Sequence, residues 1–126
     1  MVTVGNLMKK ELVTVEVGTS VVETARLMKT YNVESVLVSR QAQIVGIVTE
    51  SDVVKKYVGA EKVPYFVPVE DIMSPVPHIE ARRPLTEAAD LMDKQRTLHL
   101  GVTKAGALIG LVSVRDFLRP VSLDEF

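Results

Sequence analysis

Two short stretches of the chain share residue types that could hold a sugar. They are GIVTESD, residues 46–52, and GLVSVRD, residues 110–116. Each places a hydroxyl, Thr49 or Ser113, three residues before an aspartate, Asp52 or Asp116. An ionised carboxylate can accept several hydrogen bonds, so such an aspartate can bind both hydroxyls of a vicinal diol such as ribose. If a helix follows, its first backbone amides can donate hydrogen bonds to a phosphate. A carboxylate for the ribose and amides for the phosphate together suit a nucleotide.

The same spacing also fits a purely structural role. A hydroxyl followed three residues later by an acid is the pattern of a helix cap, and the acid suits the positive end of the helix dipole. Two details favour more than capping. The hydroxyl and the aspartate recur in both stretches, whereas another helix start exchanges Ser20 for Pro84. Gly46 and Gly110 interrupt predicted strands, which often marks close approach by a ligand or by another backbone. Both interpretations remain open on these residues.

The two stretches belong to a longer internal repeat. At an offset of 64 residues the chain aligns with itself without a gap from Val13 to Val54. Just before each copy, NLMKK corresponds to DIMSP. Identical pairs include Glu16 and Glu80, Glu23 and Glu87, Met28 and Met92, Gly46 and Gly110, and Asp52 and Asp116. Self-similarity at a fixed offset indicates two copies of one supersecondary unit.

Each copy is expected to form a strand, a helix, two strands and a second helix. Alternating or β-branched apolar runs predict the strands, and polar capping residues predict the helix starts. The first copy has strands at 13–17, 35–39 and 43–49, a helix capped by Ser20, and a helix from about 50 to 57. The second has strands within 98–103 and 107–113, a helix beginning at Pro84, and a last helix ended by Pro120.

These elements predict an α/β (α+β) fold of two β-α-β-β-α repeats packed as a pseudo-twofold pair. The predicted division is a first repeat at 1–60, a linker at 61–70 and a second repeat at 71–126. Each half is too small to bury a stable core alone, so the halves are expected to pack together. Tyr65 and Phe66, in the apolar VPYFVPV of the linker, either pack internally or form a dimer contact.

Composition excludes several classes of function. The 126 residues carry a net charge of −1 and contain no cysteine, which excludes disulfides and thiolate chemistry. Without a basic stripe, signal peptide or long apolar span, we expect a cytoplasmic protein that binds neither nucleic acid nor membrane. His78 and His99 are the only histidines. They are too few for a typical metal site, and no catalytic triad or Walker loop accompanies them.

With its paired motifs and doubled β-α-β-β-α pattern, the sequence resembles a tandem CBS-domain pair, or Bateman module, from about Val4 to Arg119. Members of that family typically dimerise and bind adenosyl ligands between the two copies. The resemblance implies that Thr49 and Asp52 hold one ribose, that Ser113 and Asp116 hold another, and that Ser51 and Arg115 face phosphate. It further implies that Thr97, Leu98 and His99 complete the Asp52 cleft, that Val33, Glu34 and Ser35 complete the Asp116 cleft, and that Thr14 and His78 lie near the base.

The sequence departs from the family pattern at two places. Gly101 stands where a proline is usual, and Glu34 brings a carboxylate toward the cleft of Arg115. A fixed Glu34–Arg115 pair would disfavour a highly charged ligand there, so the Asp52 cleft is expected to bind the more highly charged nucleotide.

The resemblance implies a non-catalytic, energy-sensing regulatory protein. It would be a homodimer that binds AMP, ADP, ATP or S-adenosylmethionine, needs no other cofactor or metal, and signals to an effector by a conformational shift. A constitutive dimeric scaffold with empty clefts is the alternative. An enzyme using His99 with Asp52 or Asp116 is a third, which lacks a nucleophile or a metal set.

Overall fold

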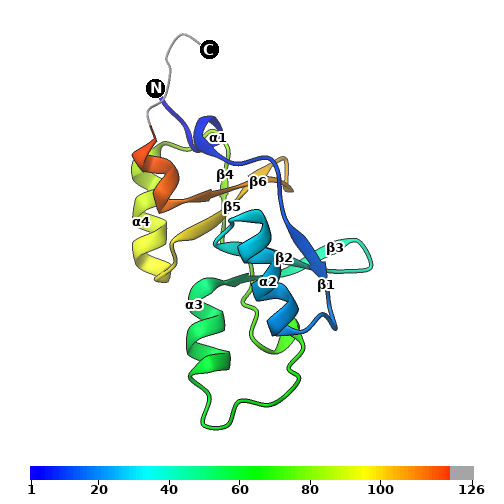
Figure 1. Cartoon of the computed structure of the whole chain (residues 1–126). Coiled ribbons are helices and arrows are strands. Elements are labelled where there is room, and N and C mark those ends of the chain that lie inside the picture. Colours follow the sequence, from blue (N-terminus) through cyan, green and yellow to red (C-terminus); the bar gives the residue numbers. More distant parts are fainter. Residues whose placement is uncertain (120–126) are drawn as a thin grey trace. The chain divides into compact units, whose positions relative to one another are not determined.

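The structure, a computed structural model, describes residues 1–119 and forms two compact units. The central unit is Leu12–Val76. The terminal unit combines Met1–Glu11 with the described residues from 77 to 119. Each unit contains one three-stranded sheet (Figure 1). The expected end of the last helix at Pro120 lies outside the described residues.

The two units contain the same series of elements. The central unit contains β1 (Thr14–Glu16), α2 (Val21–Tyr31), β2 (Ser35–Arg40), β3 (Gln43–Thr49), α3 (Glu50–Asp52), the π-helical η1 (Val53–Val58) and the 3-10 turn η2 (Val69–Asp71). The terminal unit contains α1 (Val4–Leu7), β4 (His78–Glu80), α4 (Leu85–Gln95), β5 (His99–Lys104), β6 (Ala107–Ser113) and the 3-10 helix η3 (Val114–Leu118). The predicted α/β fold of two β-α-β-β-α repeats is confirmed.

Both sheets have the same strand order and register. The order is β1-β2-β3 in one sheet and β4-β5-β6 in the other, with the first pair parallel and the second antiparallel. Thr14 lies opposite Leu37, and His78 lies opposite Gly101, at the 64-residue offset of the sequence repeat. The register shifts at Val38/Ser39 and again at Val102/Thr103. The repeat therefore extends to the irregularities of the sheets.

The long helices begin close to the predicted positions. Ser20 caps α2, and its Oγ accepts a hydrogen bond from the Glu23 amide at 3.0 Å. Pro84 occupies the equivalent cap position in extended conformation, one residue before α4 begins, rather than the first helical position.

Each core is completed by an apolar pair from the segment that precedes a repeat. Val4 and Leu7 of α1 join the core of the terminal unit, and Val69 and Ile72 join that of the central unit. All four side chains are buried, and each contributes on the order of 1.5–3 kcal/mol through burial. These pairs belong to the matching VGNLM and VEDIM stretches. The chain therefore leaves the terminal unit after Glu11 and returns to it after Val76.

The stretch predicted as a linker has two parts within the central unit. Its second part pairs with the start of α2: the Val21 amide donates to Val67 O at 2.9 Å, and the Val69 amide donates to Thr19 O at 2.7 Å. Its first part is exposed. The side chain of Tyr65 is fully exposed and Phe66 is 55% exposed, and neither belongs to the hydrophobic core of the central unit.

Candidate functional site

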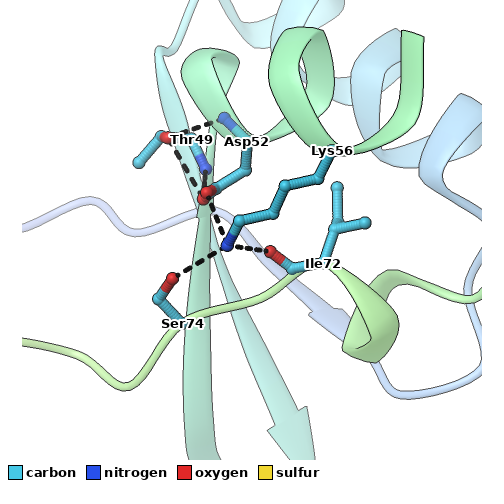
Figure 2. Close-up of polar contacts among 5 residues, drawn as sticks. All are labelled: Thr49, Asp52, Lys56, Ile72 and Ser74. Atoms are coloured by element: carbon cyan, nitrogen blue, oxygen red, sulfur yellow. Dashed lines mark hydrogen bonds and ion pairs between the residues drawn. The ribbon is translucent and has the colours of Figure 1, made fainter. Parts of the chain in front are cut away.

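In the central unit, the first motif closes a complete helix cap where β3 ends (Figure 2). Asp52 Oδ2 accepts hydrogen bonds from the Thr49 amide at 2.9 Å and from Thr49 Oγ1 at 3.1 Å. The Asp52 amide donates to Thr49 Oγ1 at 3.2 Å. The local extended-to-helical change at Thr49 thus fixes the carboxylate at the end of the strand. The capping interpretation of the motif is confirmed here.

In the terminal unit, the second motif repeats this arrangement where β6 ends. Asp116 Oδ2 accepts hydrogen bonds from the Ser113 amide at 2.8 Å and from Ser113 Oγ at 3.4 Å. The side chain of Asp116 is only 2% exposed, whereas that of Asp52 is 14% exposed. A solute therefore reaches the Asp52 carboxylate more easily than the Asp116 carboxylate.

Each motif aspartate also pairs with a cation that the sequence interpretation missed. Lys56 Nζ lies 3.0 Å from Asp52 Oδ1, and Arg119 Nη2 lies 3.2 Å from Asp116 Oδ1. Lys56 is four residues after Asp52, across α3 and η1, and Arg119 is three residues after Asp116, directly after η3. Side chains three or four residues apart are neighbours on a helix surface, so either spacing brings the cation to its aspartate. Opposite charges at these spacings were the available signal in the sequence.

The motif glycines admit a neighbouring segment rather than empty space. A Cβ on Gly46 would lie 2.5 Å from Met73 Sδ and 3.0 Å from Ser74 O. A Cβ on Gly110 would lie 2.7 Å from Met8 Sδ and 2.8 Å from Lys9 O. Of the two reasons considered for a glycine in these strands, close approach of another backbone is the one observed within each unit.

The other site residues proposed for the central unit lie near their own motif or on β1. Ser35 of β2 is directly opposite Thr49 of β3. The Glu50 amide donates to Glu34 O at 3.0 Å, which places Glu34 beside the start of α3. Val33 directly precedes Glu34 in the chain, and its amide donates to Met28 O. Thr14 begins β1, and Ser51 is exposed on α3.

The terminal unit groups its residues in the same way. His99 lies opposite Ser113, and the Val114 amide donates to Leu98 O at 3.0 Å. Thr97 Oγ1 holds the His99 backbone, accepting from its amide at 3.2 Å. The His99 side chain is buried, and Leu98 is 60% exposed. Exposed His78 begins β4, and Arg115 lies in η3. The predicted clefts combine Thr97–His99 with the Asp52 motif and Val33–Ser35 with the Asp116 motif. Each cleft would therefore join residues of two different units. This arrangement stays a prediction.

Residues 1–119 contain no cluster of three or more histidine, cysteine, aspartate or glutamate side chains suited to a metal ion. In the same range no helix has both the length and the apolar character needed to cross a membrane.

Comparisons with known proteins place this geometry in a family. The family model for the CBS domain matches twice, at residues 4–59 and 69–122. A protein of Methanopyrus kandleri is 34% identical over 121 residues, which are 94% of this chain and 62% of the relative. The chain thus spans less than two thirds of that relative's length.

Solved structures share the fold over nearly the whole chain. A protein with CBS domains from Burkholderia ambifaria has 32% identity and a TM-score of 0.86, covering 93% of this chain and 91% of that one. The CBS domain pair of protein MJ0100, in complex with 5′-methylthioadenosine and S-adenosyl-L-methionine, has 22% identity and a TM-score of 0.81, covering 94% of each chain. The chain belongs to the CBS-domain family and carries two CBS repeats in tandem.

Proposed function

We propose that this chain is a non-catalytic regulatory module that binds an adenosyl compound at its motif aspartates. The observation that carries the proposal is that both CBS repeats hold a carboxylate and a hydroxyl at the same strand end, Asp52 with Thr49 and Asp116 with Ser113. The solved CBS pair that holds 5′-methylthioadenosine and S-adenosyl-L-methionine supports an adenosyl ligand. AMP, ADP and ATP are further candidates, because they share the ribose diol.

The proposed sites take residues from both units. Thr49, Ser51 and Asp52 form the first with Thr97, Leu98 and His99. Ser113, Arg115 and Asp116 form the second with Val33, Glu34 and Ser35, and Thr14 and His78 lie near the bases. A ligand that binds one arrangement of the units better than another shifts the population toward that arrangement. An effector protein would read this shift.

A thermal-shift panel tests the proposal against the alternative of a constitutive dimeric scaffold. That alternative is favoured by the observation that both motif aspartates are satisfied as caps. AMP, ADP, ATP, S-adenosylmethionine and 5′-methylthioadenosine are added in turn to the full chain. A ligand at a hundred times its dissociation constant adds about 2.7 kcal/mol to the free energy of unfolding. No shift with any adenosyl compound would favour the scaffold.

Glu34→Gln is expected to tighten AMP or ATP binding at the Asp116 site. The change removes a negative charge and keeps the shape. A carboxylate within a few ångströms of a phosphate costs on the order of a kcal/mol even at high effective dielectric. Calorimetry in an Asp52→Ala background isolates the second site. Glu70→Gln is the control, because Glu70 instead bonds the Gly18 amide. Unchanged affinity in Glu34→Gln would mean that Glu34 does not disfavour charge at this site.

The chain is expected to be a homodimer in solution. Val63, Tyr65 and Phe66 are exposed apolar side chains close together in the sequence, and contact with a second copy would cover them. Light scattering at micromolar concentration should give twice the 13.9 kDa chain mass. The double change Tyr65→Ser and Phe66→Ser should shift the mass toward the monomer. A monomeric unmodified chain would contradict this prediction.

A further inference from the structure

Lys56 ties the first motif aspartate to a distant part of the central unit (Figure 2). Its Nζ contacts three acceptors: Asp52 Oδ1 at 3.0 Å, Ile72 O at 3.1 Å and Ser74 Oγ at 3.3 Å. A lysine ammonium has three N–H donors, so these contacts match its full capacity. Lys56 is therefore a clamp between the carboxylate and the segment 72–74.

The terminal unit has the same clamp built from a different residue. Arg119 Nη2 contacts Asp116 Oδ1 at 3.2 Å and Leu7 O at 2.7 Å. Leu7 and Ile72 occupy corresponding places in NLMKK and DIMSP. The contact is thus made twice, with a different cation at a different spacing. Its recurrence indicates that the link between aspartate and segment matters more than the residue that makes it.

Both clamped segments lead directly into the other unit. Ser74 lies two residues before the chain leaves the central unit after Val76, and Leu7 lies four residues before it leaves the terminal unit after Glu11. Before that point each segment pairs with the last strand of its sheet. The Ile47 and Ser74 amides donate to one another's carbonyls at 2.9 and 3.0 Å. The Lys9 and Leu111 amides do the same at 2.7 and 3.0 Å.

A ribose diol would compete with the clamp for the carboxylate. Asp52 Oδ2 already accepts two hydrogen bonds from Thr49, and Oδ1 accepts one from Lys56. A carboxylate has about four lone-pair positions, so one remains for a diol that donates two hydrogen bonds. The Thr49 amide is fixed by the backbone, and Thr49 Oγ1 is also held by the Asp52 amide. The Lys56 side chain, 45% exposed, is the donor most easily displaced.

We propose that Lys56 is a positioning residue that a bound ribose displaces, which loosens the segment 72–74 where it leads into the terminal unit. The inference rests on the proposed function and adds how ligand binding at Asp52 would affect the segment that joins the units. Without ligand, the clamp holds the segment 72–74 against β3. With ligand, Lys56 loses Asp52 Oδ1, and the pairing of Ser74 with Ile47 weakens. The connection at Val76 then has more freedom to change the arrangement of the units.

Amide hydrogen exchange in the full chain tests the clamp without ligand. Lys56→Met should speed exchange at the Ser74 and Ile47 amides by about fivefold, because a partly exposed charged contact is lost. Lys56→Arg should restore most of the protection. Lys55→Met is the matched control, because Lys55 is exposed beside it on η1 and should leave both amides unchanged. Equal exchange in Lys56→Met and Lys55→Met would overturn the clamp.

The uncharged ligand 5′-methylthioadenosine tests the displacement. In the unmodified chain, saturating ligand should speed exchange at Ser74 and Ile47, whereas in Lys56→Met these amides should no longer respond. Calorimetry should show that Lys56→Met binds the ligand at least as tightly, because the competitor is gone. Binding without a change in exchange, or weaker binding in Lys56→Met, would overturn the displacement and leave the proposed function standing. If calorimetry shows no binding to the unmodified chain, the proposed function fails and the displacement fails with it, while the ligand-free exchange still decides the clamp.

Discussion

Asp52→Ala is expected to abolish adenosyl binding at the first site. Two charge-assisted hydrogen bonds from a ribose diol to the carboxylate are worth a few kcal/mol together, which corresponds to a loss of affinity of about a hundredfold or more. Calorimetry with AMP and with 5′-methylthioadenosine measures it. Asp116→Ala should remove binding at the second site in the same way.

The control must separate ligand binding from helix capping. Asp52→Ala also removes the acceptor of the Thr49 amide and the ion-pair partner of Lys56, which costs about 1 kcal/mol of stability. Ser20→Ala removes the cap of α2 in the same unit, where the Glu23 amide loses its acceptor. We expect Ser20→Ala to lose about as much stability as Asp52→Ala and to keep its full affinity for the adenosyl ligand. If Asp52→Ala keeps its affinity too, the aspartate only caps the helix.

Gly110→Ala is expected to give the largest loss of stability among the glycine substitutions. The new Cβ would lie 2.8 Å from Lys9 O, a backbone atom that accepts the Leu111 amide. Relief requires the segment 8–9 to move away from β6, which breaks this pairing. Overpacking of this kind costs about 1–3 kcal/mol, and the broken pairing adds to it. Chemical denaturation measures the difference.

Gly46→Ala and Gly18→Ala are the comparison variants, with smaller expected losses of stability. In Gly46→Ala the tightest contact, 2.5 Å, is with the flexible end of Met73, and the backbone oxygen of Ser74 is farther away at 3.0 Å. We expect a smaller loss, because the end of a methionine side chain can move aside where a backbone oxygen cannot. Gly18 has a φ of 91° and open space around its Cβ position, so its substitution costs only the backbone strain, about 1 kcal/mol. A Gly110→Ala chain as stable as Gly18→Ala would contradict the close approach of Lys9.

The fold could be predicted from sequence because its signals are local and occur twice. The runs at 43–49 and 107–113 match β3 and β6 residue for residue, and the cap at Ser20 lies where the hydroxyl indicated. The motif hydroxyls and aspartates likewise lie at strand ends. A local pattern that recurs at a fixed offset is stronger evidence for a repeated structural unit than either copy alone.

The parts that could not be predicted depend on long-range contacts. Lys56 reaches Ile72 and Arg119 reaches Leu7, and no spacing rule within a helix predicts these carbonyl partners. The segments that fill the space at Gly46 and Gly110 come from outside the aligned repeat. The two glycines indicated a close approach to these strands, but no sequence pattern identified the approaching segments.

Calorimetry with a ribonucleotide and its 2′-deoxy analogue tests the central claim most directly. If the motif carboxylates bind a ribose diol, AMP should bind more tightly than 2′-deoxy-AMP, because the analogue loses one charge-assisted hydrogen bond to Asp52. The expected difference is about tenfold or more. Asp52→Ala should bring the two affinities together at the first site. Equal affinity for both sugars in the unmodified chain would contradict ribose binding by the carboxylates and leave them as helix caps.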